Sequence, residues 1–257
     1  MLGPALAALM LLFGPPEGLS HAAWGTGALM VLMAVWWATE AIPIPATSLL
    51  PLFVLPLVGA GSPAQTGSDY ANHIVILLLG GFIVALGIER WNLHQRIALN
   101  VISRVGTSPG AIVFGFMLAT AVLSMWISNT ASTLMMVPIA ISASAVLGSV
   151  SKHFTTALLL GVCYAASIGG VATPIGTPTN LIAISWLQTE AGAHIGFAQW
   201  MAFGLPAMAL LLPVAWWNVT RGMPVRSENA EAVSAHVKSQ LIGIGKMTVQ
   251  ETRVAIV

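Results

Sequence analysis

The sequence predicts an all-α polytopic membrane protein, for three reasons. Of its 257 residues, 57% are apolar, and the mean hydropathy is +0.88. Charged residues make up 7% of the chain, whereas a soluble domain carries about 25%. The apolar runs are long and continuous rather than alternating, which favours helices over an outer-membrane β-barrel. A soluble enzyme and a disordered chain are thereby excluded, and the net charge of +1 argues against a nucleic-acid partner.

Six apolar segments are predicted to cross the membrane, because a helical span needs about 20 mostly apolar residues. These segments are Leu2–Phe13, Ala23–Thr39, Ile44–Val58, His73–Gly87, Thr156–Leu187 and Phe197–Val219. The first is shorter than a bilayer requires, and no basic residue precedes it as one would in a cleavable signal peptide. We therefore expect the chain to begin within or just before a span.

The stretch Pro109–Val150 is too long for a single crossing and has polar residues in its middle. It is either two spans or a re-entrant hairpin that enters and leaves by the same face of the membrane. Both arrangements leave the basic residues on the same side, so the positive-inside rule does not separate them. We favour the hairpin, because the polar residues Ser128–Thr133 need a wet or protein-lined cavity rather than lipid.

The segment Glu89–Gly106 mixes apolar residues with Arg90, Arg96 and Arg104, which is typical of an amphipathic helix in the cytoplasmic interface. An ordinary charged loop is the alternative. With the N-terminus inside, these arginines and Arg226 all lie on the cytoplasmic side. The predicted organisation is spans and an interfacial helix in 1–106, a hairpin, broken helix and following span in 107–220, a cytoplasmic linker in 221–246, and the start of a truncated span in 247–257.

Two polar clusters stand out against the apolar background. The first, Ser124–Thr133, places Ser124 and Ser128 on one helix face, four residues apart. The second, Ser167–Asn180, contains three glycines, two prolines and three threonines within one apolar span. Proline removes a hydrogen-bond donor and glycine tolerates unusual dihedral angles, so we expect the helix to be broken there.

These clusters favour a secondary transporter. Free carbonyl and hydroxyl oxygens are hard ligands that suit Na⁺, and the positive end of an interrupted helix suits an anionic carboxylate. Broken spans that hold ion and substrate near the membrane midplane are typical of such proteins. The alternative for each cluster is close helix packing, for which Ser, Thr and Gly are also common. An intramembrane hydrolase lacks a general base in either cluster, so we do not expect an enzyme.

Four stretches of the chain resemble the divalent anion/sodium symporter family, whose members carry dicarboxylates, citrate or sulfate. They are WWATEAIPIPATSLLP (36–51), LLLGGFIVALGIERWNLHQRIAL (77–99), SMWISNTAST (124–133) and SIGGVATPIGTPTNLI (167–182). Family members are built from two inverted repeats, each with a re-entrant hairpin, a broken helix and one Ser-Asn-Thr triplet. This chain has the triplet once, at Ser128–Thr130. The resemblance therefore implies one inverted repeat, the N-terminal half of a transporter.

The resemblance also implies the roles of particular residues. Ser124, Ser128, Asn129 and Gly176 would form the first sodium site, with Thr173 as an addition from the broken helix. The substrate carboxylate would be bound by the residues Ser128, Asn129, Thr130 and, as a further addition, Thr177.

The function expected from this resemblance is sodium-coupled symport of C4-dicarboxylates such as succinate, malate and fumarate across the bacterial inner membrane. The partners expected are a dicarboxylate, Na⁺, membrane lipid and, at full length, a second copy in a homodimer. A sodium-independent dicarboxylate/citrate exchanger and sulfate transport remain the alternatives.

Overall fold

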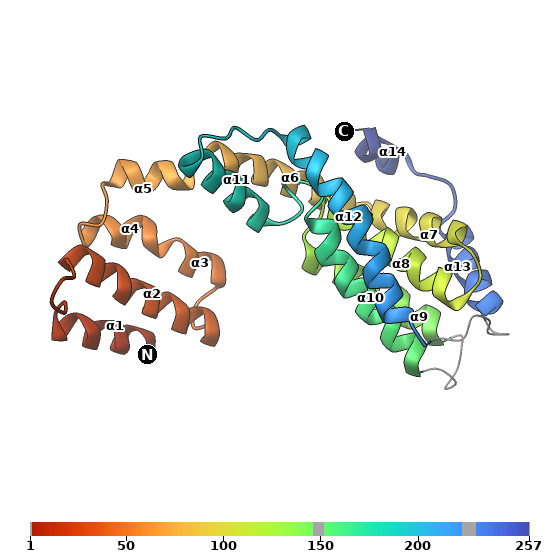
Figure 1. Cartoon of the computed structure of the whole chain (residues 1–257), viewed down its shortest axis with the longest axis horizontal. Coiled ribbons are helices and arrows are strands. Elements are labelled where there is room, and N and C mark those ends of the chain that lie inside the picture. The colour runs from red at the N-terminus through yellow and green to blue at the C-terminus, as the bar shows by residue number, and fades with distance from the viewer. Residues whose placement is uncertain (1, 146–151, 223–229, 257) are drawn as a thin grey trace. The chain divides into compact units, whose positions relative to one another are not determined.

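The computed structural model describes residues 2–145, 152–222 and 230–256, and within these ranges all regular secondary structure is helical (Figure 1). The chain forms two compact units, Met1–Ile76 and Leu77–Val257. Four apolar segments in the described part are long enough to cross a membrane: His21–Thr39, Pro63–Arg90, His153–Gly170 and Phe197–Thr220. The prediction of an all-helical membrane protein is confirmed at this level.

The first unit contains five short or medium helices and the start of a sixth. They are α1 (Leu2–Phe13), α2 (His21–Thr39), α3 (Ile44–Ser48), α4 (Leu50–Leu57), α5 (Pro63–Tyr70) and α6 (His73–Arg90). The segment predicted as one span, Ile44–Val58, is divided at Leu49 into α3 and α4. Pro51 accounts for the break, because its ring has no N–H to donate and clashes with the preceding turn.

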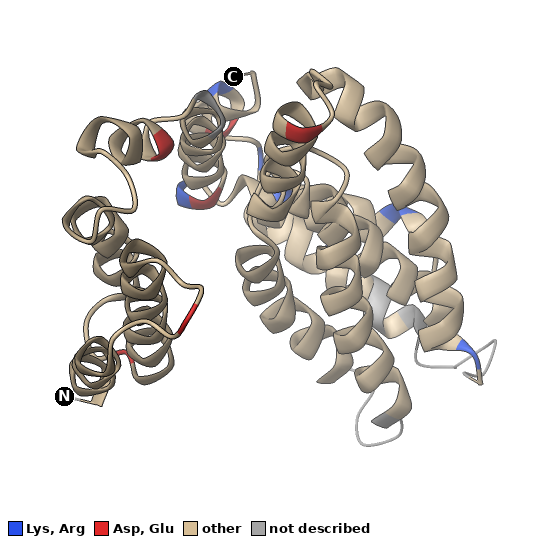
Figure 2. Cartoon of the chain, turned by 60° about the vertical axis from the view of Figure 1, so that its left-hand side comes forward, with Lys and Arg blue, Asp and Glu red and all other residues tan. Residues whose placement is uncertain are grey.

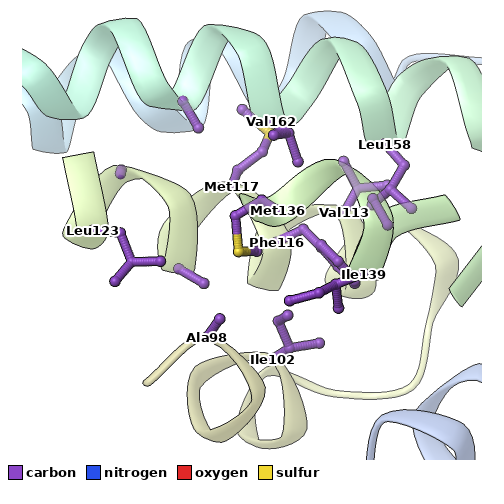
Figure 3. Close-up of a cluster of buried hydrophobic side chains, with 14 of the residues drawn as sticks. Ala98, Ile102, Val113, Phe116, Met117, Leu123, Met136, Ile139, Leu158 and Val162 are labelled. Carbon is purple, nitrogen blue, oxygen red and sulfur yellow. The ribbon is translucent and has the colours of Figure 1, made fainter. Parts of the chain in front are cut away.

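The second unit is built around α8 (Pro109–Ser124), which is apolar and buried on nearly all sides. The helices α7 (Leu93–Val105), α9 (Asn129–Ala145), α10 (Lys152–Gly170) and α12 (Phe197–Thr220) pack against it. Figure 3 shows Phe116 and Met117 of α8 meeting Met136 of α9 and Val162 of α10. This core fixes the position of the ends of α8, α9 and α10, where the polar clusters lie.

Charged residues are sparse and leave the long helices uncharged along most of their length (Figure 2). Arg96 of α7 forms an ion pair with Glu251 of α14 (Val249–Ile256), at 3.0 Å between Nε and Oε1. The guanidinium also donates to the carbonyl oxygens of Gly245 and Lys246. These bonds attach the end of α13 (Ala230–Ile244) and the start of α14 to α7.

The predicted interfacial helix and linker take a defined form in the described residues. Most of the segment predicted to be interfacial, Glu89–Gly106, forms α7, which is preceded by Asn92 in a left-handed conformation, while Glu89 and Arg90 are the last residues of α6. Within the predicted linker, α13 packs on α7 and α9. Arg226 and the end of the predicted hairpin stretch, residues 146–150, lie outside the described residues.

Replacing Phe116 by alanine tests the α8 core. Phe116 has no exposed surface, so the change leaves a cavity among α7, α8 and α9 and should lower the melting temperature in detergent. The decrease in the free energy of unfolding should be smaller than the roughly 3–5 kcal/mol that this substitution costs in the core of a soluble protein, because lipid or detergent is as apolar as the site. Phe203→Ala, at a position that is 75% exposed, is the matched control and should leave the melting temperature nearly unchanged. Equal melting temperatures for the two variants would contradict this assignment of the core.

Candidate functional site

The first polar cluster forms the tip of a helical hairpin. Helix α8 ends at Ser124, four non-helical residues follow, and α9 begins at Asn129. Ser128 caps α9, since its hydroxyl accepts a hydrogen bond from the N–H of Ala131 at 3.3 Å. Within the described residues the arms have 16 and 17 residues, the second counted to Ala145. They are therefore about 24 and 26 Å long, less than the roughly 30 Å of a hydrocarbon core.

The second polar cluster separates α10 from α11 (Pro178–Glu190). Helix α10 ends at Gly170, and residues 171–177, called here the α10–α11 connection, are not helical. The side chain of Asn180 is buried, and its amide nitrogen donates to the carbonyl oxygens of Gly170 and Thr173, both at 2.7 Å. Asn180 thus supplies donors to carbonyls that have lost their helical partners.

The hairpin tip and the α10–α11 connection lie against each other. Thr173 is fully buried, and its hydroxyl donates to the carbonyl oxygen of Met125 in the tip while it accepts from the N–H of Gly176 at 3.1 Å. Ser124 reaches across to α10, with its hydroxyl 2.7 Å from the carbonyl oxygen of Ala166. The two clusters that are separate in the sequence therefore form one site.

Glycines allow this close approach. A Cβ atom on Gly170 would lie 2.2 Å from Oδ1 of Asn129, and one on Gly169 would lie 2.2 Å from the carbonyl oxygen of Ala121 in α8. A Cβ atom on Gly176 would lie 2.5 Å from the carbonyl oxygen of Gly170 and 2.9 Å from that of Ser124. None of these three positions accepts a larger residue without displacement of backbone or of the Asn129 amide.

The site is rich in oxygen and poor in protons. The hydroxyl of Ser124 lies 2.8 Å from Oδ1 of Asn129 and 2.7 Å from the carbonyl oxygen of Ala166. A serine hydroxyl has one proton, so it can donate to only one of these acceptors at a time. The carbonyl oxygens of Ser124 and Gly170 both lie beside Gly176, and that of Gly170 already accepts from Asn180. Neutral oxygens that outnumber the protons available to them suit a hard monovalent cation.

The residues predicted to bind only sodium are buried, whereas those predicted to bind substrate, including the shared Ser128 and Asn129, are more exposed. Ser124, Thr173 and Gly176 are buried. In contrast, Ser128 and Asn129 are half-buried and Thr130 is exposed at the start of α9. Thr177 is half-buried at the start of α11, and its hydroxyl lies 3.1 Å from that of Thr179. All seven predicted positions thus belong to the tip or to the connection, with an inner oxygen-rich part and an outer accessible part.

Asn180 belongs to the second cluster, but the sequence does not predict it as a site residue. The signal that could have identified it is a polar amide shortly after Pro178 in an apolar segment.

One further feature lies apart from the site. A cavity of about 460 Å³ between α10 and α12 includes none of the predicted site residues. Among the described residues, no three His, Cys, Asp or Glu side chains gather in a way that could hold a metal ion.

Gly170→Ala should displace the Asn129 side chain, because the added methyl group would overlap its Oδ1 atom. We expect faster amide hydrogen exchange across residues 125–133, measured by mass spectrometry in detergent. Gly80→Ala is the control, since a Cβ atom there meets nothing within 4 Å. Unchanged exchange in Gly170→Ala would show that the tip does not depend on this contact.

Comparisons with known proteins place the chain in a family. The citrate transporter family (CitMHS) matches residues 34–256. The chain is 40% identical over 269 residues to the sodium-dependent dicarboxylate transporter SdcS of Staphylococcus saprophyticus, covering 100% of this chain and 51% of that protein. It is also 40% identical over 263 residues to SdcS of Staphylococcus aureus strain USA300, covering 98% of this chain and 50% of that protein. The chain thus spans about half the length of the curated relatives it matches.

These matches cover the hairpin, the connection and α12, and they confirm the family resemblance inferred from the sequence motifs. Together with the four apolar segments long enough to span a bilayer, they support a multi-pass membrane protein of a transporter family. The chain belongs to the citrate transporter family.

Proposed function

We propose that the protein takes part in sodium-coupled symport of a C4-dicarboxylate across the bacterial inner membrane, and that this chain supplies one sodium site and part of the substrate site. The observation that carries the proposal is the contact between the hairpin tip and the α10–α11 connection, which joins Ser124, Asn129 and Gly176. The relatives' names support the same ion and substrate class, since both are sodium-dependent dicarboxylate transporters.

Sodium would be bound by the buried inner part of the site together with Ser128 and Asn129, which also belong to the outer part. Oxygens of Ser124, Ser128, Asn129 and Gly176 are the proposed ligands, because they are neutral and hard, and because the one proton of the Ser124 hydroxyl faces two acceptors. Thr173 has one hydroxyl lone pair left after accepting from Gly176, so it can join the ligands as well as hold Gly176 in place. The bound Na⁺ would then offset the charge of the anion, which would be costly to bury alone.

The substrate would be bound by the outer part of the site. Ser128, Asn129 and Thr130 offer hydroxyl and amide groups at the start of α9, and Thr177 offers a hydroxyl at the start of α11. Both helices begin here, and the positive ends of their dipoles favour a carboxylate. The family's description as citrate transporters makes citrate the second candidate substrate.

The proposal includes the membrane arrangement. The described lengths of α8 and α9, 16 and 17 residues, are at or below the lower limit for a span, which supports a re-entrant hairpin, and α10 and α11 would form one broken transmembrane helix. Non-helical backbone is tolerated at membrane depth when it is surrounded by protein or lines a wet cavity. The homodimer expected from the family resemblance is retained as part of the proposal.

Uptake of labelled succinate by purified full-length protein in proteoliposomes tests the coupling. An inward sodium gradient should be required, and Asn129→Ala should abolish most of the sodium-driven uptake, since it removes an oxygen from the site. Asn100→Ala is the control, because that amide bonds only the backbone of its own helix, at Arg96. Uptake that ignores sodium but needs internal dicarboxylate would make the protein an exchanger, and sodium-driven uptake of citrate or sulfate alone would change the substrate.

Two variants should affect the two parts of the site separately, one changing the succinate concentration needed for uptake and the other the sodium concentration. Thr130→Ala should raise the succinate concentration for half-maximal uptake by about tenfold or more, as expected for loss of a hydrogen bond to a charged group. At saturating succinate, its sodium dependence should stay close to that of the unsubstituted protein. Ser124→Ala should instead raise the sodium concentration needed. If both variants shifted both concentrations equally, the division into inner and outer parts would be wrong.

A further inference from the structure

We infer that Trp200 and Gly204 of α12 are positioning residues that hold the α10–α11 connection against the hairpin tip and thereby set the sodium affinity of the site. The inference rests on the proposed function for its link to sodium. The structural claim is that α12 fixes the shape of the connection. This claim does not depend on which ion or substrate is transported.

The indole of Trp200 satisfies a carbonyl at the end of α10. Its Nε1–H donates to the carbonyl oxygen of Val171 at 2.9 Å. Val171 is the first residue beyond α10, and its side chain is 38% exposed. In an apolar setting an unpaired carbonyl costs several kcal/mol. The bond therefore selects the backbone conformation in which this carbonyl faces α12.

Gly204 lies against the backbone of Val171 and Ala172 in the connection. It lies four residues after Trp200, on the same face of α12. A Cβ atom on Gly204 would lie 2.7 Å from the carbonyl oxygen of Val171 and 2.8 Å from that of Ala172. The absence of a side chain is thus what lets both carbonyl groups approach the backbone of α12.

The same turn of α12 also contacts the hairpin tip. Phe197, three residues before Trp200, stacks on Trp126 of the tip with ring centroids 6.5 Å apart. The connection is therefore held on two sides: α12 binds residues 171 and 172, and the tip binds Thr173 through the carbonyl of Met125. Gly176, a proposed sodium ligand, follows within the same short segment. A displacement of Val171 would therefore also displace Gly176.

The decisive variant is Trp200→Phe, which keeps an aromatic ring but removes the donor. Trp216→Phe is a matched control on the same helix, because the Trp216 Nε1–H donates to the carbonyl oxygen of Gly110 at 2.8 Å, away from the connection. Both lose one indole-to-carbonyl bond, but only one of these bonds holds the sodium site. Gly204→Ala extends the series, since its methyl group would push directly on the two carbonyls.

Two measurements on purified full-length protein test the inference. The first is hydrogen exchange of the peptide that covers 171–177, in sodium-free detergent solution. Trp200→Phe should exchange faster than the unsubstituted protein, and Trp216→Phe should not. The second is the sodium concentration for half-maximal succinate uptake, which Trp200→Phe should raise about 2- to 10-fold, as expected for one neutral hydrogen bond. Trp216→Phe should leave this concentration unchanged.

The outcomes separate the two proposals. Unchanged exchange at 171–177 in Trp200→Phe, or an equal increase in both tryptophan variants, would overturn the positioning role. Faster exchange with an unchanged sodium requirement would overturn the link to sodium affinity. Sodium-indifferent uptake by the unsubstituted protein would instead refute the proposed symport, while the exchange result would still decide whether α12 positions the connection.

Discussion

The structure depends on one constraint: two pieces of non-helical backbone lie among apolar helices and must satisfy each other. The hairpin tip and the α10–α11 connection expose carbonyl groups that no longer have helical partners. In an apolar environment such groups must be bonded within the protein. Thr173 bonds Met125 of the tip, Asn180 bonds two carbonyls around the connection, and Trp200 bonds Val171. These bonds join the tip, the connection and α12 at this point.

This constraint explains which features the sequence predicted and which it did not. The location of the tip and the connection was predictable, because polar residues, glycines and prolines interrupt apolar runs at 124–133 and 167–180. The residues that form hydrogen bonds with these two segments were not predictable from the sequence. The roles of Asn180 and Trp200 depend on which carbonyl lies within reach, which is set by packing of helices far apart in the sequence. The continuous hydrophobicity of Ile44–Val58 predicts a single span, but Pro51 divides this segment into two helices.

Glycine placement illustrates the same limit of sequence reasoning. Gly169 and Gly170 belong to the cluster that is predicted to break the helix, yet α10 remains helical through both residues. Their contribution is to packing: one lies against the backbone of Ala121 and the other against the amide of Asn129. Helix packing, the alternative considered for the second cluster, therefore accounts for part of it. In this protein close packing and the polar site share the same residues, because only a glycine lets the oxygens of two helices come this close.

The four helix ends at the site would give a physical reason for the proposed binding of a cation and an anion together. Helices α8 and α10 end at Ser124 and Gly170, so their negative dipole ends and free carbonyls lie there. Helices α9 and α11 begin at Asn129 and Pro178, so their positive ends lie beside the other two. The carbonyl ends are suited to a cation and the amide ends to a carboxylate, without any ionised side chain. Because the oxygen-rich part is the buried one, a cation bound there would add its field to the positive ends of α9 and α11. Neutral groups arranged in this way would make binding of the anion depend on binding of the cation, which is the requirement for coupling.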